Sequence, residues 1–160
     1  MAERVRMYAN YGSKEKYKHV IQGVNSRLDE IQAAVLLLKL KKLDEDNQHR
    51  RHIAHIYKSY IKNPFVVLPQ YADEDSVYHI FPVLVDNRKK FQTYLIEKGI
   101  ETLCHYPIPV HKQKSFSFYN SLTFKESENI ANQEVSLPIS PVLTDDEAMY
   151  ISQMINNYND

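Results

Sequence analysis

The segment that decides the fold is residues 23–45, which read GVNSRLDEIQAAVLLLKLKKLDE. Ser26 is a suitable N-cap, because its hydroxyl can accept the free amide of Asp29, and the carboxylates of Asp29 and Glu30 favour the positive end of a helix. The spacing predicts a long helix over residues 26–43. Its middle is apolar nearly all round, so we expect a second domain or subunit to cover it.

The rest of the chain alternates between helix and strand patterns. A second helix is predicted over 46–62, where the dipeptide Asn63-Pro64 ends it. Residues 14–19 show no period and are predicted to form a loop. Further helices are expected after Asn87 and after a Thr144/Glu147 capping box, and strands over 76–85, 100–104 and 135–139. This order predicts an α/β fold of the α+β-like layer type, in which a long leading helix precedes a small mixed sheet with flanking helices.

Composition excludes several classes of protein. The chain has 20 Lys plus Arg and 20 Asp plus Glu, which lacks the basic excess of a nonspecific nucleic-acid binder. One cysteine excludes an intrachain disulfide and a multi-cysteine zinc site. The longest apolar run, Ala33 to Leu38, is far too short for a membrane span, and no signal peptide is visible. We therefore expect a cytoplasmic protein that binds no nucleic acid and no membrane.

One candidate phosphate site lies at residues 23–27. The free amides of a helix N-terminus, the Asn25 amide and the Arg27 guanidinium together suit an anion. A simply capped helix start explains the same residues and is favoured by this segment alone.

A second candidate site is the stretch HYPIPVH at residues 105–111, after a predicted strand. Its prolines restrict the backbone, so imidazole and phenol groups could be aimed at a ligand, although a structural turn explains the spacing as well. Cys104 is not favoured as a nucleophile, because it and His105 would point to opposite faces of a strand. The histidines at 49, 52 and 55 drift around a helix and indicate a solvated face, so no metal site is predicted.

Several motifs in order resemble one enzyme family. They are GVNSRLDEIQAA (23–34), RR (50–51), YHIF (78–81), GIET (99–102), HYPIP (105–109) and SLPI (136–139). Together they resemble the C-terminal part of the DegT/DnrJ/EryC1/StrS aminotransferases. These enzymes use pyridoxal phosphate (PLP) to aminate keto sugars on nucleotide carriers, in the biosynthesis of cell-surface polysaccharides or deoxyamino sugars.

The resemblance implies a fold-type-I arrangement. Residues 1–43 would be the tail of the large PLP-binding domain, including the interdomain helix, and residues 44–160 the small C-terminal domain. It also implies that Asn25 reaches the cofactor phosphate across a subunit interface. The same resemblance places Arg27, His105 and Tyr106 near the nucleotide sugar.

The resemblance places the catalytic lysine, which forms the Schiff base with PLP, upstream of residue 1. We therefore assign no catalytic residue, and we expect PLP not to bind this chain alone and transamination not to occur. The expected partners are a second copy, in a homodimer or larger assembly, and possibly a separately encoded large-domain half. The alternative is a non-catalytic stand-alone binding or oligomerisation module with the same small-domain fold.

Overall fold

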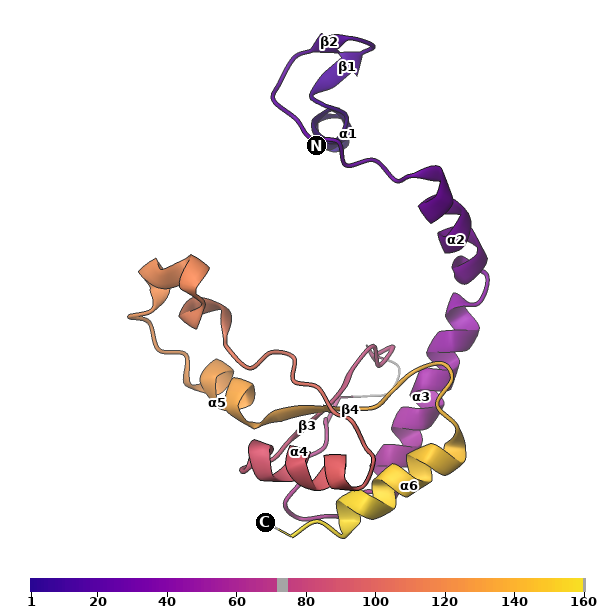
Figure 1. Cartoon of the computed structure of the whole chain (residues 1–160), viewed down its shortest axis with the longest axis vertical. Coiled ribbons are helices and arrows are strands. Elements are labelled where there is room, and N and C mark those ends of the chain that lie inside the picture. The colour runs from indigo at the N-terminus through magenta and orange to yellow at the C-terminus, as the bar shows by residue number, and fades with distance from the viewer. Residues whose placement is uncertain (72–74, 160) are drawn as a thin grey trace. The chain divides into compact units, whose positions relative to one another are not determined.

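The chain divides into two units, Met1–Leu43 and Asp44–Asp160, in the computed structural model, which describes residues 1–71 and 75–159 (Figure 1). The first unit contains helix α1 (Ala2–Ala9), the strands β1 (Ser13–Glu15) and β2 (Lys18–His19), and helix α2 (Glu30–Leu40). The predicted loop over 14–19 is wrong, because β1 and β2 pair as an antiparallel hairpin.

The first unit is held by main-chain contacts. Of residues 1–43, all of which the structure describes, only Gly12 is buried. A Cβ atom at Gly23 would lie 2.2 Å from the Gly12 nitrogen, so the two backbones touch where they cross. Gly12 also has φ +75, which L side chains adopt at a cost. This unit therefore has no hydrophobic core of its own.

Helix α2 begins at Glu30, with Asp29 as its N-cap, so the predicted start at Ser26 is wrong. The N–H groups of Val24 and Ser26 donate to the carbonyl oxygens of Tyr8 and Ala9 at 2.8 and 2.9 Å. Asn25 itself pairs with Asn10 in an antiparallel bridge. These bonds hold the chain extended before the helix, which the local capping pattern could not reveal. A turn at Lys41 and Lys42 then separates α2 from the next helix.

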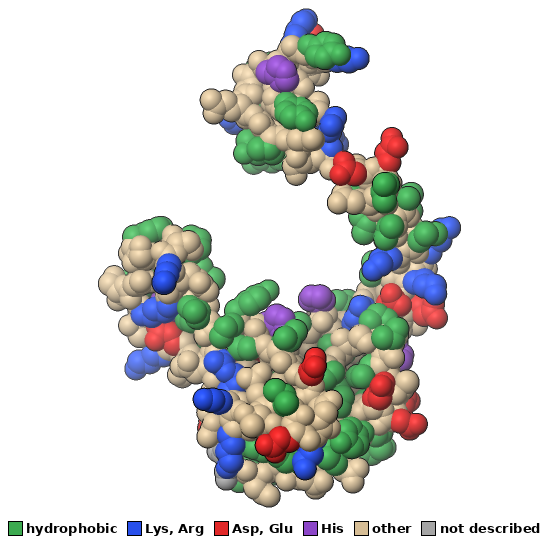
Figure 2. All heavy atoms as spheres, viewed as in Figure 1, with side chains coloured by type: hydrophobic (Ala, Val, Ile, Leu, Met, Phe, Trp, Pro, Cys, Tyr) green, Lys and Arg blue, Asp and Glu red, His purple; other side chains and the backbone are tan. Residues whose placement is uncertain are grey.

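No residue of α2 is buried, although the helix is largely aliphatic. Ile31 is 82% exposed, and hydrophobic side chains show at the surface along α2 (Figure 2). The other exposed aliphatic residues of this segment are Leu28, Val35, Leu36, Leu37, Leu38, Leu40 and Leu43, and these eight side chains are called the α2 apolar face below.

The second unit is built on two antiparallel strands. β3 (Phe81–Leu84) pairs with β4 (Glu134–Leu137), with Phe81 opposite Leu137 and Leu84 opposite Glu134. Single antiparallel bridges extend the sheet, from Val67 to Leu84 and from Leu103 to Ser136. The α/β class is confirmed, but the expectation of a mixed sheet is wrong because every one of these pairings is antiparallel. The predicted strand at 100–104 contributes only the Leu103 bridge.

Helices α3 (Leu43–Tyr60), α4 (Arg88–Glu97) and α6 (Asp145–Asn156) surround this sheet. The buried Asn63 amide donates to the carbonyl oxygens of Ile155 and Tyr158 at 2.7 and 2.8 Å, which fixes the end of α6 against the end of α3. The capping box of Thr144 and Glu147 is confirmed at the start of α6. The core is formed by apolar side chains from all these elements, among them Ile53, Tyr57, Tyr78, Phe81, Val83, Phe91, Leu95, Val135, Ala148 and Ile155.

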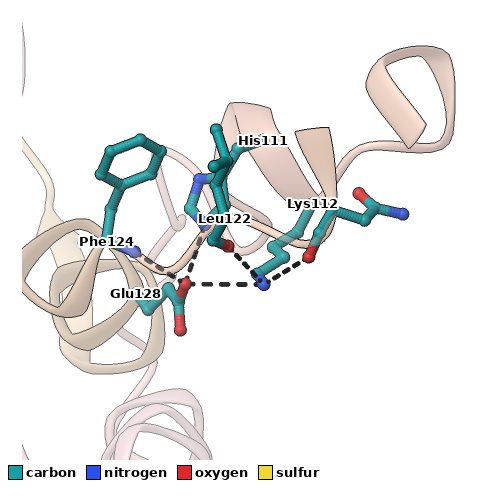
Figure 3. Close-up of polar contacts among 6 residues, drawn as sticks. His111, Lys112, Leu122, Phe124 and Glu128 are labelled. Carbon is teal, nitrogen blue, oxygen red and sulfur yellow. Dashed lines mark hydrogen bonds and ion pairs between the residues drawn. The ribbon is translucent and has the colours of Figure 1, made fainter. Parts of the chain in front are cut away.

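An excursion leaves the sheet between Leu103 and β4. It carries the short 3-10 helices η2 (Val110–Lys112) and η3 (Lys114–Tyr119) and then α5 (Lys125–Gln133). The Glu128 carboxylate closes it, because Oε1 lies 2.8 Å from Nε2 of the buried His111 and accepts the Phe124 N–H at 3.1 Å (Figure 3). Lys112 Nζ lies 3.7 Å from the same oxygen. In the described part of the chain no helix combines the length and the apolar character needed to cross a bilayer.

Candidate functional site

A pocket of about 300 Å³ lies beside His105 in the second unit. Residues of β4 and of the Leu103 bridge form part of its wall. Its lining consists of His79, Ile80, Glu101, Leu103, His105, Ser136, Leu137, Pro138 and Ile139. The combination of two imidazoles, one carboxylate and an apolar wall suits a small polyhydroxylated ligand.

His105 is anchored from behind by β4. Its backbone N–H donates to Glu134 Oε2 at 2.7 Å, and its ring Nδ1 lies 2.8 Å from Ser136 Oγ. Ser136 Oγ in turn donates to Glu134 Oε1 at 2.5 Å. Glu134 and Ser136 are 2% and 5% exposed, so this cluster is shielded from solvent.

Cys104 also contacts the Glu134 carboxylate. Burial, together with a hydrogen bond to Glu134, raises the pKa of the Cys104 thiol to about 11. Arg88 Nη1 donates to Cys104 Sγ at 3.1 Å and to the Ala131 carbonyl oxygen. A thiol held in its protonated form is a poor nucleophile, which agrees with the sequence argument against this role.

Tyr106 lies next to His105 at the protein surface. It is 73% exposed, and its ring stands edge-on to the imidazole with centroids 5.4 Å apart. The structure therefore brings these two candidate residues together beside the pocket, with the phenol free to meet a ligand or another chain.

The other two candidates, Asn25 and Arg27, meet in the first unit. Arg27 Nε donates to Asn25 Oδ1 at 3.1 Å, and the guanidinium lies 5.8 Å from the centre of the Tyr11 ring. Both side chains are exposed. The predicted helix start at Ser26 does not form beside this site, because α2 begins at Glu30, with Asp29 as its N-cap and the carboxylate of Glu30 in its first turn. That part of the phosphate-site prediction is wrong.

Among the described residues, the donors of Asn25 and Arg27 fit the phosphate end of PLP. The Asn25 amide and the Arg27 guanidinium are exposed hydrogen-bond donors of the kind that hold a phosphate. A lysine that bonds covalently to a carbonyl group needs a lowered pKa. The side-chain contact of Lys14 Nζ with Glu3 at 2.7 Å instead raises the pKa of Lys14, and Lys18 is paired with Glu15.

The histidines of α3 serve as links to α6. His49 Nε2 lies 2.7 Å from the Leu143 carbonyl oxygen, and His52 Nε2 lies 2.9 Å from the Asp145 carboxylate. The prediction of a solvated face is therefore wrong for His49, which is half-buried, whereas His52 and His55 are exposed as predicted. Among residues 1–71 and 75–159, no three His, Cys, Asp or Glu side chains converge as a metal site would require.

The sequence argument missed Glu134, Ser136 and Arg88. A partial signal existed, because Ser136 lies in the strand predicted over 135–139, and Glu134, two residues earlier, shares its face in the observed strand β4. Their contact with His105 could not be read from the sequence, because 29 and 31 positions separate the partners.

Comparisons with known proteins agree on one family. A family model for the DegT/DnrJ/EryC1/StrS aminotransferases matches residues 1–156. The dTDP-3-amino-3,6-dideoxy-alpha-D-galactopyranose transaminase of Aneurinibacillus thermoaerophilus is 50% identical over 159 residues, which cover 99% of this chain and 44% of that protein. This chain thus spans less than half the length of that relative.

Solved structures give the same result. DesV of S. venezuelae, in complex with a ketimine intermediate, superposes with a TM-score of 0.89 and 39% identity over 98% of this chain and 43% of DesV. NtdA of Bacillus subtilis with bound cofactor PMP gives 0.85 and 29% identity over 94% of this chain and 38% of NtdA. With the family model matching nearly every residue, the resemblance seen in the motifs is confirmed, and the chain belongs to the DegT/DnrJ/EryC1/StrS aminotransferase family.

Proposed function

We propose that residues 1–160 form the C-terminal part of a PLP-dependent aminotransferase that converts a nucleotide-linked keto sugar into an amino sugar in the cytoplasm. The observation that carries this proposal is 50% identity, over 99% of this chain, to a transaminase of a dTDP-linked amino sugar. The match covers 44% of that relative, so the proposed activity is that of the whole enzyme, to which these residues contribute.

The two structural units have different tasks in this proposal. Residues 1–43 are the tail of the large cofactor-binding domain, and residues 44–160 are the small domain. The break between the two units after Leu43 supports this division. The α2 apolar face then packs against the rest of the large domain, which accounts for a helix without buried residues.

The chain contributes binding groups at both ends of the reacting pair. Asn25 donates its amide to the cofactor phosphate across the subunit interface, and Arg27 lies near the nucleotide sugar. His105 and Tyr106 bind polar groups of that sugar at the pocket beside β4. PLP, when bound, supplies the electron sink through which an amino group is exchanged.

We further propose that this chain alone does not transaminate. Two of the six lysines of the first unit, Lys14 and Lys18, support this because each is paired with a carboxylate. A charged, paired amine lacks the lone pair that bonds to a carbonyl carbon. As the family resemblance implies, we assign the covalent step to a lysine in the part of the large domain outside residues 1–43.

Complementation tests both proposals. The chain is purified alone and together with the lysine-bearing N-terminal part of the Aneurinibacillus thermoaerophilus transaminase. Each sample is incubated with PLP, 2-oxoglutarate and the dTDP-linked amino sugar named for that enzyme, and glutamate is measured. We expect glutamate only from the pair; an inactive but stably assembled pair contradicts the assigned function, and activity of the chain alone contradicts the assigned dependence.

A matched pair of variants locates the phosphate contact. Asn25→Asp in the active pair should raise the PLP concentration needed for half-maximal activity at least about tenfold, because a carboxylate repels the phosphate. Asn132→Asp adds the same charge at an exposed position of α5 and should leave that concentration unchanged. Equal effects of the two substitutions contradict the role of Asn25.

The α2 apolar face favours a second candidate function, a non-catalytic oligomerisation or binding module. Large exposed aliphatic surfaces mark sites of association. A self-contained dimer that binds dTDP-glucose in calorimetry without PLP, and that gains no activity in the complementation assay, would favour this module over the enzyme part.

A further inference from the structure

The buried carboxylate behind His105 has no task in the function proposed above. Glu134 is 2% exposed, and both of its oxygens are engaged, Oε2 by the His105 backbone N–H at 2.7 Å and Oε1 by Ser136 Oγ at 2.5 Å. Buried carboxylates are costly unless hydrogen bonds compensate them. These two bonds also restrict the imidazole of His105, because Ser136 Oγ contacts it.

Hydrogen counting fixes the direction of each bond. Ser136 Oγ donates its single hydroxyl hydrogen to Glu134 Oε1 at 2.5 Å. With that proton committed, Ser136 Oγ can only accept from its other neighbour. That neighbour is His105 Nδ1 at 2.8 Å, so Nδ1 must carry a hydrogen.

We propose that Glu134 and Ser136 act as positioning residues that hold neutral His105 as the Nδ1–H tautomer, with Nε2 left as a hydrogen-bond acceptor at the pocket. Nε2 has no hydrogen-bond partner among the residues that the structure describes. The ring is therefore set to recognise a donor on the ligand.

This assignment also narrows the ligand chemistry, a step that rests on the proposed function. An accepting Nε2 binds a hydroxyl or amine hydrogen and disfavours a carbonyl oxygen at the same place. In a pocket that binds a nucleotide-linked sugar, Nε2 of His105 then accepts a hydrogen bond from a sugar hydroxyl group. The tautomer itself can be measured without any ligand, so its failure is separate from failure of the proposed function.

The experiment is a long-range ¹H–¹⁵N NMR spectrum of the histidine rings of the whole 160-residue chain, recorded at a pH where His105 is neutral. The signals of His105 are assigned by their loss in His105→Gln. We expect the protonated ring nitrogen to be Nδ1. A ring protonated at Nε2 in the unsubstituted chain overturns the proposal.

Two substitutions test the relay. In Glu134→Gln the new amide can donate to Ser136, which frees the serine hydroxyl to donate to Nδ1, so the ring hydrogen should move to Nε2. In Ser136→Ala the preference for Nδ1–H should be lost, while Ser136→Thr, which keeps the hydroxyl, should retain it.

A buried serine elsewhere supplies the control. Ser152 donates to the Ala148 carbonyl oxygen within α6, and Ser152→Ala should leave the His105 ring signals unchanged. If Glu134→Gln does not fold, Ser136→Ala and Ser136→Thr still test whether Ser136 controls the tautomer of His105. Retention of the Nδ1–H form in Ser136→Ala, or in a folded Glu134→Gln, contradicts the relay.

Discussion

Tyr57 on α3 donates its hydroxyl hydrogen to the carbonyl oxygen of Pro138 at 2.7 Å. The tyrosine is fully buried in the core, whereas Pro138 lines the pocket beside His105. This one bond therefore ties the longest helix of the second unit to the wall of the candidate site. Burial raises the pKa of Tyr57, so the phenol keeps its hydrogen throughout the pH range in which the protein is handled.

Removal of this hydroxyl should destabilise the second unit. Tyr57→Phe keeps the ring but leaves the Pro138 oxygen without its donor, which should lower the free energy of unfolding by about 1–2 kcal/mol. Urea titration followed by circular dichroism measures the change. Tyr60→Phe, at an exposed position of the same helix, should be close to neutral, and equal losses in the two variants would argue against the bond.

Glu128 should make the fold sensitive to acid. Its hydrogen bonds with His111 and the Phe124 N–H, with Lys112 nearby, lower the pKa of its carboxyl group in the folded chain. A lowered folded-state pKa contributes stability above the ordinary value of 4.5, and this contribution is lost as the pH falls through the folded-state pKa. Glu128→Gln should therefore flatten the loss of stability between about pH 6 and about pH 3.

The matched control for Glu128 is its neighbour Glu126, which is exposed on the same helix. Glu126→Gln should retain the slope of the unsubstituted chain. Thermal unfolding across the pH series measures both variants, and a slope in Glu128→Gln as steep as in the control contradicts the role of the His111 contact.

Cys104 should react slowly with thiol reagents while the chain is folded. A pKa of about 11, against an ordinary value of 9.0, means about 100-fold less thiolate near neutral pH. Absorbance-monitored reaction with a disulfide reagent should be about tenfold slower than for the same chain in urea, because the higher nucleophilicity of a thiolate of higher pKa offsets part of the loss of thiolate. Comparable rates in both conditions would show that the thiol is not held as described.

The α2 apolar face should drive self-association of the isolated chain. We expect a homodimer or larger assembly in light scattering, because eight aliphatic side chains are exposed together. Leu37→Lys with Leu40→Glu should shift it toward monomer, whereas Val142→Lys, an exposed apolar position of the second unit, should not. A chain that is monomeric at every concentration contradicts this expectation.

Local patterns were sufficient to predict much of the second unit. Asn87 accepts the Lys90 N–H at the start of α4, and Thr144 with Glu147 begins α6, because capping depends on residues three positions apart. The motifs around Asn25 and His105 were sufficient to identify the family, since their order extends over the whole chain.

The element boundaries that the sequence failed to predict depend on hydrogen bonds between residues far apart along the chain. The start of α2 moved to Glu30 because Val24 and Ser26 bond to Tyr8 and Ala9, far back along the chain. The predicted strand at 100–104 shrank to Leu103, and the next residues turn toward Glu134 instead of extending. The hydrogen bonds of His105 are also long-range contacts, because their partners Glu134 and Ser136 lie on β4.

The missing core of the first unit has a consequence for handling the protein. Main-chain hydrogen bonds without buried side chains open readily, so residues 1–43 present scissile peptide bonds to a protease. Brief digestion with trypsin should cut after Lys14, Arg27, Lys39 or Lys42 and leave a resistant fragment that begins at Leu43, the first residue of α3. Proteolysis would then separate the two units at the boundary between α2 and α3, where a segment without a core gives way to one with a core.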